Sequence, residues 1–189
     1  GKPLNCRTPH DAIVNGVVMV PEDRKLQGII PRMSVGRNIS IGSLDQITNR
    51  LGFVNTRREE QIGLEGKANF NIKTPDLEKP IVELSGGNQQ KAIVARWMST
   101  KPEVLILDEP TKGIDVGAKS EFYNMICEFA KEGLAVILIS SELPEMMGMA
   151  DRVITFCEGR ITAEFTSNEI EQERIVNAAF GFQNAEELS

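Results

Sequence analysis

Residues 104–111 read VLILDEPT, an apolar run that ends in two acids and a proline. Two similar runs occur: residues 17–20 (VVMV), followed by a proline, and residues 134–139 (LAVILI), followed by two serines. Continuous apolar runs without alternation are typical of strands covered on both faces, as in a parallel sheet. Residues 116–132 repeat apolar side chains at helical spacing before a glycine, so the stretch 104–139 predicts a strand–helix–strand unit.

Further helices and a hairpin are predicted outside these runs. Thr8 caps a helix that begins with a proline, and Ser141 is the expected cap of a later helix. Residues 152–157 and 160–165 flank a Glu-Gly pair, which predicts a hairpin, and residues 168–180 fit a last helix ended by a glycine. The chain therefore has the element pattern of an α/β protein.

The region between residues 31 and 100 has a different character. Strand patterns stop there, and broken helical pieces follow, the last of them at residues 89–98 with apolar side chains on one stripe. We therefore expect an α/β lobe formed by residues 1–32 and 100–189, with a helical lobe of residues 33–99 inserted into it.

Composition excludes several classes of function. The formal net charge of −6 would repel a phosphate backbone and no basic run offsets it, so we expect no nucleic-acid partner. The three cysteines are widely spaced and accompanied by one histidine, which points to reduced thiols rather than a metal site. The apolar runs fall short of the roughly 20 residues that cross a bilayer, so any membrane association should come through a partner.

Polar side chains follow each of the three predicted strands. Glu22 follows the first, Asp108 and Glu109 end the second, and Ser141 follows the third. Ligands of open α/β sheets bind beyond the carboxyl ends of the strands. At such an edge one carboxylate can hold Mg²⁺ or its water while the next orients an attacking water, although solvated acids would give the same pattern.

A glycine-rich loop, residues 84–91 (LSGGNQQK), lies shortly before the second strand. Gly86 and Gly87 leave backbone N–H groups free to approach an anion, Ser85 adds a hydroxyl, and a following helix favours negative charge at its start. Ser85 is also a candidate helix cap. Such a loop alone is often a simple turn, but its position before a strand ending in Asp-Glu-Pro-Thr makes the combination specific.

Together these motifs resemble the ABC ATPase family over nearly the whole chain. Leu84–Gln89 matches its signature motif, Val104–Glu109 its Walker B strand and Gly113–Asp115 its D-loop. Residues 20–25 and the Asn-Gln-Gln-Lys ending of the signature look like the C-terminal half of the tandem ATP-binding subunits of ribose, galactose and xylose importers. This resemblance implies a P-loop NTPase (RecA-like) parallel-sheet lobe with an inserted helical lobe.

The resemblance also implies roles for particular residues. Glu109 would be catalytic, Asp108 would hold Mg²⁺ through water, and Asp115 would belong to the D-loop. ATP would be held by a partner half and contacted in trans by the signature residues Ser85, Gly86, Gly87 and Asn88. The implied function is coupling of ATP hydrolysis to carbohydrate uptake.

The implied partners follow from the same resemblance. They are the N-terminal ATPase half of the same subunit or a second copy, a membrane permease and, indirectly, a sugar-binding protein, at the cytoplasmic face of the inner membrane. The family's coupling groove for the permease would lie near residues 31–42. Apolar residues there exceed what a surface loop needs, and packing inside the lobe is the alternative explanation; they are Ile29, Ile30, Met33, Val35 and Ile39.

The chain departs from the family pattern in three places. The Walker A loop is absent, since Gly1-Lys2 and Gly66-Lys67 lack its upstream glycine and its Ser/Thr, and we interpret this as N-terminal truncation. The isolated chain should therefore bind ATP and Mg²⁺ weakly or not at all and be inactive. Glu22 stands at the Q-loop position and Ser141 at the switch-histidine position, so the site on this half should hydrolyse poorly.

Two other classes of function share these motifs. A soluble ABC ATPase acting on nucleic acid is disfavoured by the charge and by the short insert, which lacks heptads. A regulatory half-domain would keep the motifs only as structure. ATP turnover by the intact parent protein separates that second class from an ATPase.

Overall fold

The computed structural model describes residues 3–181. By internal contacts the chain forms two compact units, Gly1–Ile139 and Ser140–Ser189. The first contains a parallel sheet and a helical region, and the second contains a hairpin and two helices. A search of residues 3–181 finds no helix with the length and apolar character that a bilayer-spanning segment needs.

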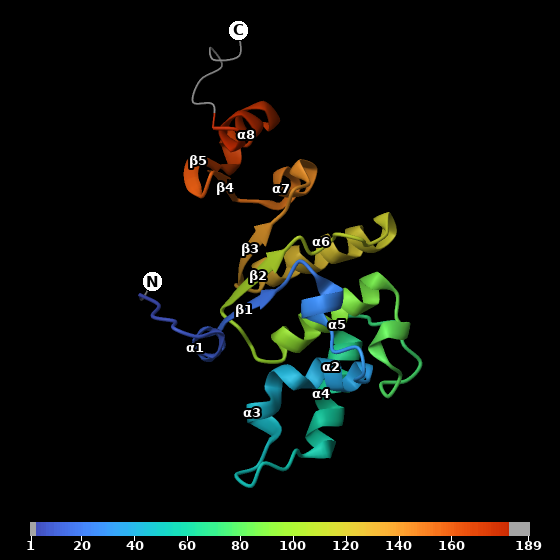
Figure 1. Cartoon of the computed structure of the whole chain (residues 1–189). Coiled ribbons are helices and arrows are strands. Elements are labelled where there is room, and N and C mark those ends of the chain that lie inside the picture. Colours follow the sequence, from blue (N-terminus) through green and yellow to red (C-terminus); the bar gives the residue numbers. More distant parts are fainter. Residues whose placement is uncertain (1–2, 182–189) are drawn as a thin grey trace. The chain divides into compact units, whose positions relative to one another are not determined.

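The three predicted strands form one parallel sheet in the order β1-β2-β3 (Figure 1). They are β1 (Val17–Val20), β2 (Val104–Asp108) and β3 (Ala135–Ile139). Val20 lies opposite Leu107, which in turn lies opposite Leu138. The carboxyl ends of the strands therefore meet at one edge of the sheet, as the sequence predicts for an α/β fold.

Helix α6 (Val116–Lys131) connects β2 to β3 and completes the predicted strand–helix–strand unit. It begins where the Asp115 carboxylate accepts a hydrogen bond from Ala118 N at 3.0 Å, and a left-handed Gly133 follows its end. Its buried face consists of Phe122, Ile126 and Phe129. Each such buried side chain contributes roughly 1.5–3 kcal/mol, which fixes α6 against the sheet.

Helices make up the segment between β1 and β2 (Figure 1). They are the π-turn η1 (Arg24–Gly28), α2 (Val35–Ser40), η2 (Ile41–Ser43), α3 (Leu44–Ile47), α4 (Thr56–Asn69), η3 (Ile81–Glu83) and α5 (Gly86–Met98). Helices α2, α4 and α5 pack against one another so closely that a Cβ on Gly66 would lie 2.7 Å from Ile39 Cγ2. Ile93 and Val94 of α5 are fully buried and join this region to the core of the sheet.

The apolar residues near the predicted coupling groove belong largely to this core. Val35 and Ile39 are 0% exposed and Ile29 is 7% exposed. The expectation that they form an exposed docking surface is therefore wrong for these three residues, and the alternative explanation of internal packing holds. The reason is that α2 packs against α4 and α5, and all three side chains belong to the hydrophobic core that these helices share.

The buried guanidinium of Arg96 in α5 forms hydrogen bonds with α2 and with the end of η1. Its Nη1 donates to Gly28 O at 2.7 Å, its Nε to Asn38 O at 2.6 Å and its Nη2 to Asn38 Oδ1 at 2.9 Å. Asn38 is fully buried and its Nδ2 donates in turn to the carbonyls of Ile30, Met33 and Ser34. Burial lowers the pKa of Arg96 to about 10, so the guanidinium stays charged at neutral pH.

Helix α1 (Pro9–Val14) starts as predicted. Thr8 occupies the cap position, its hydroxyl accepts from Asp11 N, and the Asp11 carboxylate accepts from Thr8 N in return. Hydrogen bonds from the Arg7 and Thr8 amides lower the pKa of Asp11, which keeps the carboxylate charged at the positive end of the helix.

The second unit contains the predicted hairpin, β4 (Arg152–Cys157) and β5 (Arg160–Thr166). Glu158 and Gly159 both have positive φ, at +48° and +76°, as a two-residue hairpin turn requires. Helix α8 (Gln172–Ala179) packs on this hairpin through Ile175 and Ala178. The hairpin and α8 thus share a small hydrophobic core of their own.

Two predicted helix starts in this unit are wrong. Helix α7 (Leu143–Met149) has Glu142 at its cap position instead of Ser141, because the Ser140 hydroxyl accepts from Glu142 N and holds the turn before the helix. The last helix begins at Gln172 rather than residue 168. A capping box between Thr166 and Glu169 closes a separate 3-10 turn, η4 (Ser167–Glu169), after which Ile170 is extended.

We expect Arg96→Met to lower the free energy of unfolding by about 3 kcal/mol, because it leaves several buried carbonyl oxygens without a donor. Urea denaturation monitored by circular dichroism measures the change. Arg57→Met, at an exposed arginine in the first turn of α4, is the matched control and should change stability by less than about 0.5 kcal/mol. Equal effects of the two substitutions would contradict a structural role of the buried guanidinium.

Candidate functional site

The start of α5 has the chemical features of an anion site. Ser85 lies at the N-cap position with extended backbone, and within the described residues its hydroxyl makes no capping bond to the helix. The first-turn N–H groups of Gly86, Gly87 and Asn88 therefore remain available, and the dipole of a 13-residue helix favours negative charge there. Ser85 is exposed, so an incoming group can reach it.

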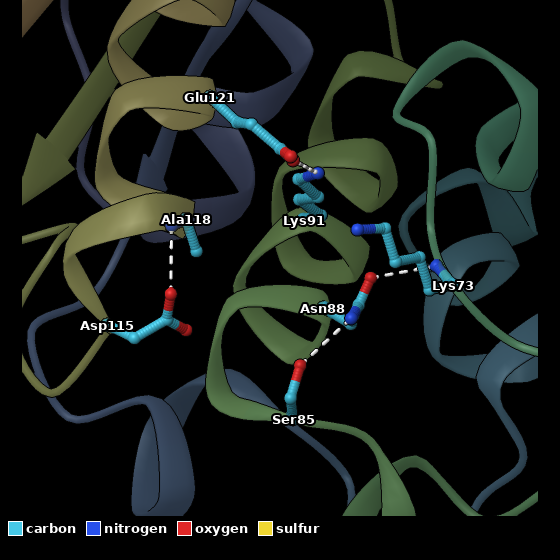
Figure 2. Close-up of polar contacts among 7 residues, drawn as sticks. All are labelled: Lys73, Ser85, Asn88, Lys91, Asp115, Ala118 and Glu121. Atoms are coloured by element: carbon cyan, nitrogen blue, oxygen red, sulfur yellow. Dashed lines mark hydrogen bonds and ion pairs between the residues drawn. The ribbon is translucent and has the colours of Figure 1, made fainter.

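Asn88 sets the direction of the Ser85 hydroxyl (Figure 2). The backbone N–H of Lys73 can only donate, and it donates to Asn88 Oδ1 at 2.8 Å. This contact fixes the amide so that Nδ2 donates to Ser85 Oγ at 2.9 Å. Since Oγ accepts this bond, its own proton points elsewhere and can be donated to an anion.

The two glycines of the loop lie where a side chain would crowd its neighbours. A Cβ on Gly86 would be 2.8 Å from Arg24 Nη2 and 3.2 Å from Gly113 O. A Cβ on Gly87 would be 3.0 Å from Ala118 Cβ, in the first turn of α6. The loop at 85–88 therefore packs directly against η1 and against the segment that follows β2.

A charged cluster flanks this loop (Figure 2). Lys91, only 8% exposed, forms a 2.5 Å ion pair with Glu121 of α6. The hydrogen bond and charge of Lys91, and then the charge of Lys73, lower the pKa of Glu121. The charge of Asp115 opposes this shift, so two ammonium groups and two carboxylates lie near one another beside the start of α5.

The carboxyl edge of the sheet carries the predicted acids. Asp108 ends β2 opposite Ile139, and Glu109 N donates to Ile139 O at 2.9 Å. Glu109 has φ +44°, a left-handed conformation that costs a non-glycine residue about 1 kcal/mol and that often occurs at functional sites. The strained turn ends β2 and starts the loop that carries Lys112.

Glu22 is paired rather than isolated. Lys112 Nζ lies 2.6 Å from Glu22 Oε1, and these side chains are 65% and 49% exposed. The hydrogen bond and charge of Glu22, followed by the charges of Glu109 and Asp108, raise the pKa of Lys112. Lys112 therefore offsets part of the charge of Glu22, although the exposed pair is screened by water, and the role of Glu22 at the Q-loop position stays a prediction.

Glu22 and Lys112 line a depression of ≈ 340 Å³ together with Asp23, Arg24 and Lys25. The nearby oxygens of Asp108 and Glu109 are suitable ligands for Mg²⁺. Within residues 3–181, however, no three acidic, histidine or cysteine side chains gather into a cluster that could hold a metal ion.

The other predicted site residues lie on two different units. Asp115 caps α6 with its carboxylate, as described above. Ser141 lies in the second unit, two residues before α7, and its role as the switch position stays a prediction. The sequence did not indicate a role for Arg24, which lies in the recognised stretch 20–25, or for Lys112, which precedes the D-loop, because their partners lie 65 and 90 residues away along the chain.

Comparison with known proteins identifies the family. Residues 2–112, more than half of the chain, match the family model described as ABC transporter. The chain belongs to this family. The parallel sheet with its helical region is accordingly the ABC ATPase version of the P-loop NTPase fold.

Three relatives of this ABC transporter chain are sugar-import proteins by name. The ribose import ATP-binding protein RbsA of Rhodopirellula baltica is 48% identical over 96% of this chain and 35% of its own length. The arabinose import ATP-binding protein AraG of Pseudomonas syringae is 47% identical, and the xylose import ATP-binding protein XylG of Pectobacterium atrosepticum 46%, each over 95% of this chain and 35% of its own length. The chain spans about a third of these relatives, and the predicted resemblance to their C-terminal half is confirmed.

Solved structures of ABC cassettes share the fold. The ATP-binding cassette MJ1267 in its ADP conformation has a TM-score of 0.70 at 21% identity, over 93% of this chain and 72% of its own. The cassette MJ0796, a dimer in a post-hydrolysis state with ADP and phosphate, has a TM-score of 0.66 at 17% identity, over 84% and 66%. At these identities the likeness establishes the fold of this ABC transporter chain.

We expect Ser85→Ala to change the free energy of unfolding by less than about 0.5 kcal/mol, because the exposed hydroxyl does not cap α5. Asp115→Ala is the comparison, since its carboxylate does cap α6, and it should cost about 1 kcal/mol. Chemical denaturation of the two variants measures both changes. A larger loss for Ser85→Ala than for Asp115→Ala would show that the hydroxyl supports the helix.

Proposed function

We propose that this chain is a nucleotide-binding half of an ABC importer ATPase. In this proposal it supplies Ser85, Gly86, Gly87 and Asn88 to ATP held by a partner half, and the complete subunit couples ATP hydrolysis to carbohydrate uptake. The partner half is the N-terminal half of the same subunit or a second copy. The assembly would act at the cytoplasmic face of the inner membrane with a permease and a sugar-binding protein.

The hydrogen bond from Asn88 to Ser85 is the observation that carries the proposal. It holds the hydroxyl with its proton available, next to the open backbone N–H groups at the start of α5. A terminal phosphate presents oxygens that accept from all of these donors. A site meant only to start a helix would more simply direct the serine hydroxyl to the backbone.

The names of the relatives support the carbohydrate part of the proposal. RbsA, XylG and AraG are called import ATP-binding proteins for ribose, xylose and arabinose. Their identity to this chain is similar in all three cases, and all three sugars are pentoses, which favours a pentose-type sugar as a class. The specific sugar would be selected by the permease and binding protein.

Asp108 and Glu109 are the proposed metal and catalytic residues of the other nucleotide site. When bound, Mg²⁺ would neutralise phosphate charge there, with Asp108 holding it through water. Glu109 would orient the attacking water as a general base. Ser141, at the switch position, carries no ionisable group to replace a histidine, so this site is expected to turn over slowly.

The decisive test is Ser85→Ala in the full-length protein, assayed for steady-state ATP hydrolysis. Loss of a charge-assisted hydrogen bond to phosphate, worth roughly 1.5–3 kcal/mol, should lower turnover about ten- to a hundred-fold. Ser43→Ala is a control at a buried serine of η2 that pairs with Ser99, and turnover should stay within about twofold. Unchanged turnover in Ser85→Ala would remove the main support for a trans-acting signature loop.

A second prediction compares the two nucleotide sites. Glu109→Gln should lower ATP turnover of the full-length protein by less than about tenfold, whereas the matching change in the other half should cost about a hundredfold or more. The reason is that the nucleotide site that contains Glu109 is expected to contribute only a small part of the total ATP turnover. An equal or larger loss from Glu109→Gln would assign the active site to the opposite half. A wild-type protein that turns over no ATP would instead favour a regulatory half-domain.

A further inference from the structure

Arg24 reaches from the loop after β1 to the signature loop. It opens η1, which Asp23 caps by accepting from Lys25 N and Leu26 N. Its Nε donates to Gln89 Oε1 at 3.2 Å, a contact between residues 65 positions apart. Its Nη2 lies beside Gly86, at 2.8 Å from where a Cβ would be.

Gln89 extends this contact to the residue before Ser85. Its side chain is buried, and its Nε2 donates to Leu84 O at 3.0 Å and to Ile81 O at 3.3 Å. The amide orientation is consistent throughout, because the carbonyl end faces the arginine donor and the amino end faces two carbonyls. Arg24 thus borders Ser85 on both sides, because it is linked to Leu84 through Gln89 and its guanidinium lies beside Gly86.

This placement is electrostatically unfavourable on its own. The half-buried guanidinium is partly desolvated, which lowers the pKa of Arg24, and it lies at the positive end of the α5 dipole. Within the described residues, the bond to Gln89 is the one hydrogen bond that it makes. Because a cation at the positive end of the helix dipole does not stabilise the helix, the position of Arg24 is better explained by a functional role at the signature loop.

We propose that Arg24 is a positioning residue for the signature loop, an inference that rests on the proposed trans-acting function. Its hydrogen bond to Gln89 and the position of its guanidinium beside Gly86 hold Ser85 and the first-turn N–H groups in the geometry that accepts a phosphate. A loop free to shift by a fraction of an ångström would present these donors less effectively to the transition state. Arg24 also lines the depression that contains Glu22, so it lies between the signature loop and the segment that follows β1.

The test uses the full-length protein and three variants. Arg24→Met removes the hydrogen bond and should lower kcat for ATP about tenfold while KM changes less than about twofold, since the partner half holds the nucleotide. Arg24→Gln places an amide nitrogen at the position of Nε and should restore kcat to within about threefold of wild type. Arg57→Met, the exposed control in α4, should match wild type.

The double variant Arg24→Met/Ser85→Ala separates positioning from an independent effect. If Arg24 acts through the loop that carries Ser85, the double variant should lose less than about threefold beyond Ser85→Ala alone. A fully multiplicative loss would overturn the inference, and so would wild-type kcat in Arg24→Met or an Arg24→Gln variant as impaired as Arg24→Met. Thermal melting of each variant, with assays run well below the transition, keeps misfolding from imitating these results.

Failure of this inference can be told apart from failure of the proposed function. Wild-type turnover in Ser85→Ala would reject the trans-acting signature loop itself, and Arg24 would then have no loop to position. Impaired turnover in Ser85→Ala together with wild-type kcat in Arg24→Met would reject only the role of Arg24.

Discussion

The buried guanidinium of Arg96 is the constraint on which the helical region and the candidate site depend. Its three hydrogen bonds join α5, the end of η1 and α2 in a region that is otherwise apolar. Because hydrogen bonds from a buried cation are directional, they select one arrangement of these helices, whereas apolar contacts alone would allow several. Gly86 lies ten residues earlier on the same helix, about 15 Å away, so the placement of one end of α5 determines the other.

Much of the fold could be predicted from local patterns. The three strands are continuous apolar runs closed by chain-breaking or polar residues, and α6 lies between a capping Asp115 and a left-handed Gly133. Each of these patterns depends on a few residues that are neighbours in the sequence, and the folded structure keeps the local conformation that they favour. Helix starts in the second unit were less predictable, because Ser140, Ser141 and Glu142 could each end the turn and a bond between the first and third decides.

The sequence motifs predicted which segments form the candidate site, and the structure shows which side chains within those segments contact one another. The loop at 84–91 and the acids of β2 could be named from the sequence, but the contacts that organise them could not. Arg24 meets Gln89 only because η1 packs against α5, and Lys112 meets Glu22 only because the loops after β1 and β2 lie side by side in the fold. The buried Arg96 was equally hidden, since an arginine in an amphipathic helix ordinarily faces solvent.

The tight packing of Gly86 and Gly87 has an evolutionary consequence. A side chain at either glycine would crowd atoms of this same chain, Arg24 Nη2 and Gly113 O for the first and Ala118 Cβ for the second. Selection for stability would therefore retain them in a descendant that had ceased to use nucleotide. Ser85, which is exposed and supports the helix little, is under no such constraint. A descendant sequence in which Ser85 is replaced while both glycines are kept would therefore be one in which the loop no longer binds nucleotide and is retained only for the stability of the fold.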